Sequence, residues 1–191
     1  MANSVAARGL KPIRHRNGAP YNGGGSLYHV SSTYATAIAP GDPVTVTGTA
    51  DANGIPTVAR TAAGAGNATT GVVIGRTNGQ GTLLQSDALE LPASTGGYLL
   101  VEDNPDVVFE VQMDGAFAVT DISNNTNYTA AAASSLDFSG FEASSTSIGT
   151  GATLQLKILR LVQREGNSVD TNAKVEVMIN NHTQAHNTAG V

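Results

Sequence analysis

The sequence predicts an all-β protein, built as an antiparallel β-sandwich or barrel. Short β-prone segments recur at the spacing typical of sandwiches and barrels, and turn pairs such as Asn53-Gly54 and Gly96-Gly97 separate them. No segment shows the 3.6-residue apolar period of a long amphipathic helix. At 191 residues, the chain is long enough to bury a sizeable core of its own.

Residues 1–26 are expected to form an extended basic arm on a flexible hinge. They show neither strand nor helix periodicity, end near the triple glycine at 23–25, and contain four cations but no acid. Because the body that follows is acidic and a single aromatic residue lies nearby, an acidic protein partner fits this arm better than nucleic acid. The candidate binding residues of the arm are Arg8, Lys11, Arg14, Arg16 and Tyr21.

Residues 27–184 are expected to form a single β domain, followed by a loose polar tail at 185–191. The predicted strands lie at roughly 27–36, 43–48, 55–60, 70–76, 82–86, 97–103, 106–113, 116–121, 152–164 and 173–180.

The stretch 98–115 is predicted to be the central hairpin of this domain. Two apolar alternations meet there at a turn around Pro105, which presets a turn conformation. In the second arm Val107, Phe109 and Val111 fall on one side of a strand, so that side is predicted to face the core and the other to be mostly polar. Asp114-Gly115 then signals a second turn into the strand at 116–121.

The segment 122–151 is longer than an ordinary connection and carries large apolar residues without a steady period. Such a loop is usually functional or packed on a partner. Charged residues make up only 13% of the chain, about half of the roughly 25% typical of soluble domains. Together these features favour a homo-oligomer, a trimer rather than a dimer.

The last two predicted strands have different apolar patterns. In 152–164 the apolar phase shifts near Arg160, which indicates a bulge or a strand buried on both faces. In 173–180 Val175, Val177 and Ile179 fall on one side of a strand, with Glu176 and Asn180 opposite, which indicates that the apolar side is buried.

Searches for catalytic and metal-binding patterns favour a protein that is not an enzyme and has no metal or cofactor. The absence of cysteine removes disulfides, thiolate zinc sites and cysteine nucleophiles. His182 and His186 have the spacing of two helical zinc ligands, but this segment has no helical pattern and no nearby glutamate. The glycine-rich runs at 64–71 and 75–81 lack the Gly-Lys-Ser/Thr of a phosphate loop and are expected to be turns.

Four acids lie close together in sequence at Glu102, Asp103, Asp106 and Glu110. They lack the alternating oxygen ligands of a calcium loop, so they are expected to form a solvated acidic turn. The chain also shows neither a signal-peptide core nor a window apolar enough to span a membrane, so it is expected to be soluble, with no membrane partner.

Four sequence blocks, at 40–48, 70–79, 98–115 and 154–167 with 173–184, resemble tailed-bacteriophage capsid decoration (cement) proteins. The DNPDVVFEVQ stretch at 103–112 and the VMINNH stretch at 177–182 are the most specific parts. The blocks PGDPVTVTG and TGVVIGRTNG also look like the small trimeric head-stabilising proteins of lambda-like phages. The resemblance implies a jelly-roll-like or lambda-type decoration fold, often trimeric and sometimes dimeric.

The resemblance further implies a virion structural protein that is made in the host cytoplasm and sits on the capsid exterior. Its partner would be the major capsid protein, whose neighbouring subunits it would clamp, commonly through an extended arm, without touching nucleic acid. The alternative is a carbohydrate- or receptor-binding β module of a phage tail or surface appendage. Sugar sites usually use exposed aromatic platforms, and the chain has no tryptophan, five tyrosines and four phenylalanines.

Overall fold

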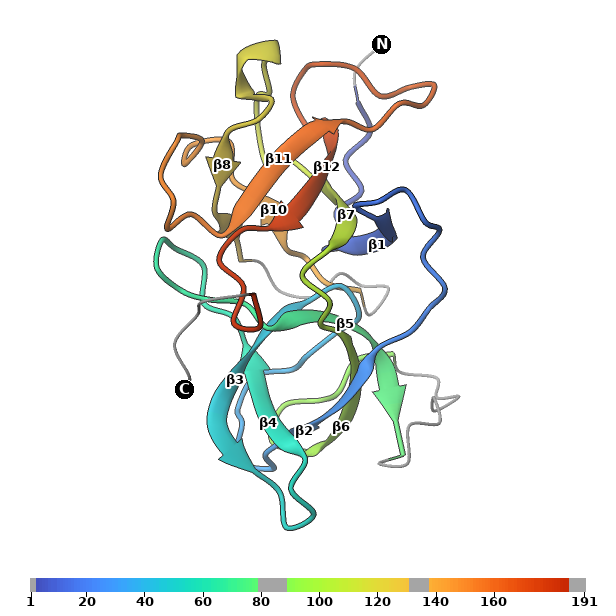
Figure 1. Cartoon of the computed structure of the whole chain (residues 1–191), viewed down its shortest axis with the longest axis vertical. Coiled ribbons are helices and arrows are strands. Elements are labelled where there is room, and N and C mark those ends of the chain that lie inside the picture. The colour runs from blue at the N-terminus through green and yellow to red at the C-terminus, as the bar shows by residue number, and fades with distance from the viewer. Residues whose placement is uncertain (1–2, 79–88, 131–137, 186–191) are drawn as a thin grey trace.

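The protein consists of a closed β-barrel and a five-stranded sheet stacked along its long axis (Figure 1). The computed structural model describes residues 3–78, 89–130 and 138–185. Its all-β character confirms the predicted fold class. The barrel has the closed strand order β2-β4-β3-β5-β6, with bounds Ser26–Val30 (β2), Pro43–Ala50 (β3), Pro56–Arg60 (β4), Gly71–Thr77 (β5) and Gly97–Glu102 (β6).

The second half of the molecule is an open sheet of strand order β1-β7-β12-β11-β8. Its bounds are Lys11–His15 (β1), Val107–Gln112 (β7), Asn125–Thr126 (β8), Leu156–Leu161 (β11) and Lys174–Ile179 (β12). A short antiparallel pair, Tyr128–Thr129 (β9) with Glu142–Ala143 (β10), lies beside it, and Val119–Asp121 form one turn of 3-10 helix (η1). No helix in these described ranges is long and apolar enough to cross a membrane.

Each half has its own apolar cluster, as the alternating strand patterns require. In the barrel, inward-facing residues such as Val44, Leu99 and Val101 are fully buried. Under the sheet, Phe109, Ile158 and Val177 belong to a second cluster. All barrel pairings are antiparallel except β2 with β4, which meet in parallel at His29 and Thr57 and close the cylinder.

Gln155 joins the two halves through its side chain, which is fully buried. Its Nε2 donates to the carbonyls of Ala62 (2.8 Å) and Asn67 (3.1 Å), in the loop between β4 and β5. Its Oε1 accepts from the backbone N–H groups of Gly64 (2.9 Å) and Tyr128 (3.2 Å). One glutamine therefore makes all four hydrogen bonds that its amide can form, and it ties a barrel loop to the sheet half.

The predicted central hairpin at 98–115 is wrong, because its two arms lie in different sheets. β6 pairs with β2 and β5, whereas β7 pairs with β1 and β12. The turn at Pro105 is real, with the Asp106 N–H donating to Asn104 Oδ1 at 2.9 Å, but it carries the chain from the barrel to the sheet. Each arm therefore pairs with two neighbouring strands. In an isolated hairpin, each arm would pair only with the other.

The predicted core side of β7 is confirmed, since Val107, Phe109 and Val111 are at most 1% exposed. The opposite side is more covered than the pattern predicts. Gln112 is 3% exposed because its Oε1 accepts from the N–H of Ala6 (2.9 Å) and its Nε2 donates to Glu142 (2.8 Å). The N-terminal segment therefore covers part of a face that the alternation assigns to solvent.

Residues 3–26 do not form the free arm expected from their composition. β1 pairs with β7 as an edge strand of the sheet, with Lys11 opposite Glu110, and Leu10 is buried in the core. Gly9 allows this docking: its φ is +66°, and a Cβ there would lie 2.3 Å from the carbonyl oxygen of Gly41. The segment looked unstructured because β1 contributes few apolar residues and obtains its order from its partner strand.

The expected strand at 116–121 is also wrong, since its last three residues form η1. In the following segment, Tyr128 and Phe141 pack edge to face in the protein's own core, with ring centroids 5.8 Å apart. These two aromatic residues are therefore not available to a partner. Leu136 and the expected strand at 82–86 lie outside the described residues.

The C-terminal strands agree with the sequence. The register of β11 against β12 shifts between Ile158 and Arg160, which confirms the bulge, and Val175, Val177 and Ile179 face the core. After β12, His182 bridges to Thr69 and is 2% exposed, so residues immediately following Asn181 are docked on the barrel. Residues 186–191 of the predicted tail, including His186, lie outside the described residues.

Candidate functional site

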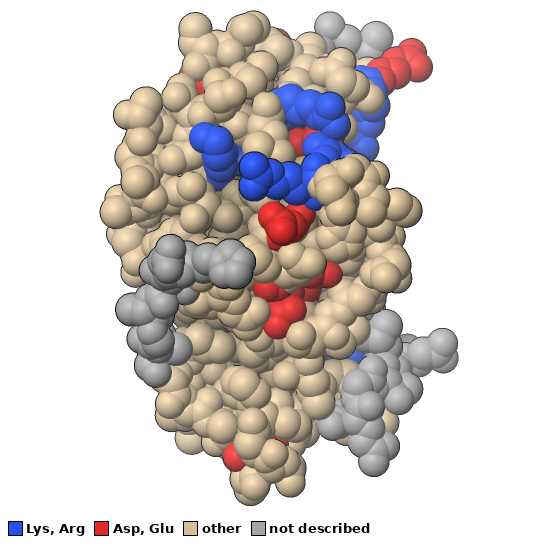
Figure 2. All heavy atoms as spheres, viewed as in Figure 1, with Lys and Arg blue, Asp and Glu red and all other residues tan. Residues whose placement is uncertain are grey.

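The outer face of the five-stranded sheet carries most of the cations of the protein. Figure 2 shows Lys and Arg side chains gathered over this half of the molecule, with few on the barrel half. Six cations lie there with three carboxylates: Glu110 and Glu176 on the strands, and Glu142, which accepts a hydrogen bond from Gln112 of β7. The net charge of this set is +3, on a chain of net charge −5. We call the following set the cationic face: Lys11, Arg14, Lys157, Arg160, Arg164 and Lys174.

The strand registers bring these residues together in rows. Lys11 lies opposite Glu110, Glu110 opposite Glu176, and Glu176 opposite Arg160, so four strands contribute one row across the sheet. Two like charges directly opposite each other destabilise a sheet. The arginines remove this repulsion, and three of the four ion pairs of the described residues lie on this face.

Glu176 is the buried centre of the arginine cluster. Its Oε2 accepts from Arg14 Nη2 at 2.5 Å and from Arg160 Nε at 3.0 Å. Burial opposes its ionisation, but the hydrogen bonds from Arg160 and Arg14 outweigh burial and hold the pKa of Glu176 below its ordinary value. Glu110 binds Arg164 in the same way at the edge of the face.

The lysines complete the face without a carboxylate partner among the described residues. Lys11 and Lys157 are exposed and Lys174 is half-buried. Lys157 Nζ donates to the carbonyl of Ser123 at 3.1 Å, and no ion pair joins any of the three to an acid in the described ranges. The arginines of this face therefore pair with its carboxylates, whereas the positive charges of the lysines are left without an acidic partner in the described ranges.

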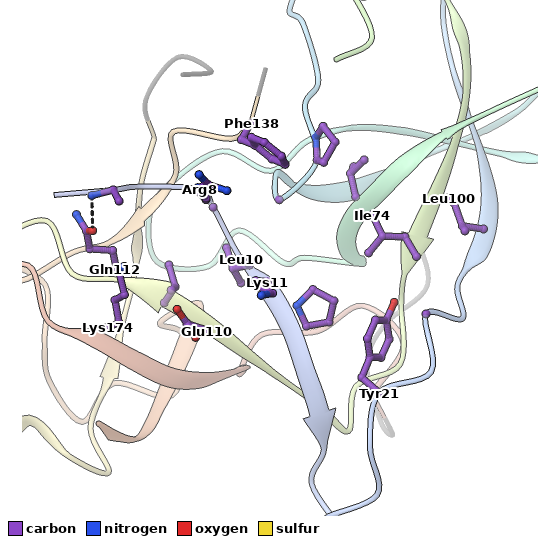
Figure 3. A pocket seen from close by; sticks show the side chains of 18 of the residues that line it. Arg8, Leu10, Lys11, Tyr21, Ile74, Leu100, Glu110, Gln112, Phe138 and Lys174 are labelled. Carbon is purple, nitrogen blue, oxygen red and sulfur yellow. Dashed lines mark hydrogen bonds between the residues drawn. The ribbon is translucent and has the colours of Figure 1, made fainter. Parts of the chain in front are cut away.

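A groove of about 780 Å³ runs beside this face, between the sheet and the barrel. Figure 3 shows Arg8 and Lys11 on the N-terminal segment, with Lys174 on the sheet side. The barrel side presents Ile74 of β5 and Leu100 of β6. The remaining described residues of note at the groove are Tyr21, Glu110, Gln112, Phe138 and Arg164.

Two of the five sequence-predicted site residues lie on the cationic face. Lys11 and Arg14 belong to β1, and Lys11 also lines the groove. Arg8 lies over the ring of Phe138, with Cζ 5.2 Å from the ring centroid. Tyr21 lines the groove and donates its hydroxyl to the carbonyl of Gly24 (2.9 Å).

Arg16, the fifth predicted residue, lies apart from the face and the groove. It follows the end of β1, where its N–H donates to the carbonyl of Asp106 at 2.7 Å, and its side chain is exposed beside Asn104 and Asp106.

Sequence reasoning missed four of the six cations of the cationic face: Lys157, Arg160, Arg164 and Lys174. Alternation within each strand placed Lys157 and Lys174 opposite the core. The pairing of β1 with β7, β7 with β12, and β12 with β11 decides that they join Lys11 and Arg14. That neighbour order is not encoded in any local pattern.

The acidic turn also differs from its prediction. Glu102 is 5% exposed, and burial raises its pKa. Asp103 accepts from the hydroxyls of Ser26 (3.0 Å) and Tyr28 (2.9 Å). Asp103 therefore anchors the end of β6 to β2, and Glu102 accepts from the N–H of Asn104 (3.0 Å) in the turn. Asp106 is exposed as expected.

Comparison with known protein families, curated protein sequences and solved structures found no match for this chain. The resemblance to decoration proteins therefore stays a prediction from the four sequence blocks. The described residues contain no group of three or more histidines and acids placed to hold a metal ion. Charge and shape complementarity are the chemistry that the cationic face and its groove offer to a partner.

Proposed function

We propose that this chain is a non-catalytic virion structural protein that decorates the outer surface of a phage capsid and clamps neighbouring major capsid subunits. The cationic face is the attachment surface in this proposal. The supporting sequence features are the four blocks that resemble decoration proteins, and the supporting structural feature is the all-β body.

The observation that carries the proposal is the concentration of charge. A net charge of +3 lies on one sheet face of a chain whose total is −5, so the rest of the surface repels acidic partners while this face attracts them. Such an asymmetry orients a protein as it approaches an acidic protein surface. The ladders on the central strands fix the backbone positions from which most of these side chains extend.

Clamping follows from several such faces in one assembly. In a homotrimer, which we expect, the second and third attachments become intramolecular, and avidity can exceed the affinity of one face by about 10²–10⁴. Light scattering of the purified protein measures the number of chains in the oligomer. A stable monomer at micromolar concentration would contradict the trimer.

Co-sedimentation with capsids that lack the protein tests the proposed function. The double variant Lys157→Glu with Lys174→Glu should lose capsid occupancy, because both side chains present charge without a carboxylate partner in the described structure. The matched control is Arg16→Glu, which changes a cation away from the face and should keep occupancy. Equal loss in both variants, or binding of neither the wild type nor the variants to capsids, would refute the proposal.

A further inference from the structure

The groove between sheet and barrel has two chemically different walls. One wall carries cations: Arg8 and Lys11 come from the N-terminal segment, and Lys174 comes from the sheet (Figure 3). The other wall is apolar and comes from the barrel, where Ile74 and Leu100 are half-buried. A ligand that fills this groove must therefore satisfy positive charge along one side and apolar surface along the other.

The one carboxylate that the described residues place at the groove does not neutralise its cationic wall. Glu110 lines the groove, but it is already bound to Arg164. Arg8, Lys11 and Lys174 have no ion pair with any acid in the described ranges. The guanidinium of Arg8 is instead placed over the ring of Phe138, which holds it at the groove in a fixed position.

We infer that this groove binds an extended acidic segment of a partner protein, one in which carboxylates alternate with apolar side chains. In an extended chain, successive side chains point to opposite sides, so one set can meet Arg8, Lys11 and Lys174 while the other packs on Ile74 and Leu100. The volume of about 780 Å³ lies within the range of sites that bury small ligands or short peptide segments.

The same features weigh against a nucleic acid as the occupant. Single-stranded nucleic acids bind through aromatic side chains on which bases stack. The aromatic residues at the groove are Tyr21 and Phe138, and Arg8 covers the ring of Phe138.

This inference rests on the proposed function for its natural partner, a capsid subunit, but the groove can be tested alone. Fluorescence anisotropy with a capped heptapeptide of alternating Asp and Leu provides the probe. Two comparison peptides replace Leu by Ser or Asp by Lys, and a single-stranded oligonucleotide serves as the nucleic-acid probe. Saturable binding of the Asp-Leu peptide alone is the expected result.

Variants locate the binding site. Lys11→Glu with Lys174→Glu should weaken peptide binding about tenfold or more at low salt, and the loss should shrink as salt screens the charges. Ile74→Ala should weaken binding about fivefold at every salt concentration, because the lost contact is apolar. Arg16→Glu should bind the peptide like the wild type, and thermal melts check that each variant folds.

The outcomes separate this inference from the proposed function. Equal binding of the Ser peptide, preferred binding of the oligonucleotide, or indifference to the lysine and Ile74 variants would each overturn the peptide groove. Capsid binding without peptide binding would overturn the groove and leave the decoration role standing. Peptide binding that responds to these variants, without capsid binding, would support the groove and overturn the decoration role.

Discussion

Replacement of Gln155 by leucine should destabilise the protein more than a single hydrogen bond can explain. The change keeps the approximate size of the side chain but removes the four hydrogen bonds that join a barrel loop to the sheet half. The free-energy cost depends on whether water can reach the groups that lose their partner. An unpaired buried backbone group costs about 1–3 kcal/mol, whereas an exchange with water costs about 1 kcal/mol.

The four groups fall into two classes. Ala62 and Asn67 belong to an exposed loop and Gly64 is half-exposed, so their backbone groups can regain hydrogen bonds from water after a small shift. Tyr128 is 2% exposed, so its N–H cannot regain a hydrogen bond from water. Three groups at about 1 kcal/mol and one at about 1–3 kcal/mol predict a loss of about 4–6 kcal/mol in the free energy of unfolding.

Urea unfolding measures this loss as a lower midpoint at an unchanged slope. Gln163→Leu is the matched control, because Gln163 is exposed and its Nε2 bonds only the nearby carbonyl of Leu161, so its loss should stay within about 0.5 kcal/mol. Amide hydrogen exchange should also speed up at Gly64 and Tyr128 in the Gln155 variant. A loss below about 1 kcal/mol would refute the reasoning and show that the loop does not depend on this side chain.

Phe109→Asp should cost more than about 3 kcal/mol, because it buries an unpaired carboxylate and removes a ring from the core, whereas Glu110→Ala should cost about 1 kcal/mol or less; similar melting temperatures would mean that the register of β7 is wrong. His182 is buried, which lowers its pKa to about 4 from 6.5, so its contribution is complete above pH 6.5 and is lost as the pH falls toward 4. His182→Gln should therefore flatten the stability–pH curve by about 3 kcal/mol between pH 6.5 and 4, and parallel curves for the two proteins would contradict this assignment. Deletion of residues 1–25 should lower the melting temperature markedly, because it removes β1 and the buried Leu10, and an unchanged melting temperature would show that the edge strand adds nothing to the fold.

Because the N-terminal segment supplies strand β1 to the sheet, its deletion is a poor test of attachment. A free arm could be deleted without harm to the body, but a segment that supplies a strand cannot. Loss of capsid binding after deletion would then reflect unfolding as much as lost contact. Charge reversals at exposed lysines separate these causes, since they leave the strand in place.

The sequence by itself determined the fold class, the turns and the core side of individual strands. The two-residue period of a strand is local, so Phe109, Val175 and Val177 could be assigned to the core without any knowledge of their neighbours. The bulge in β11 was equally local, because a shift of apolar phase is visible within one strand. The N-terminal cations were visible as a block in the sequence, but the pairing of their strand with β7 was not.

Only the tertiary structure decided which strands are neighbours, and the candidate site depends on that choice. A turn at Pro105 is compatible both with a hairpin and with a passage from one sheet to another, since proline presets the local turn but does not decide which strand the following residues pair with. β1 carries too few apolar residues to be recognised as a strand, and its order comes from the edge of β7. The cationic face arises because strands far apart in the chain pair side by side. Those pairings are selected by the packing of the complete fold, and the sequence of a single segment does not determine them.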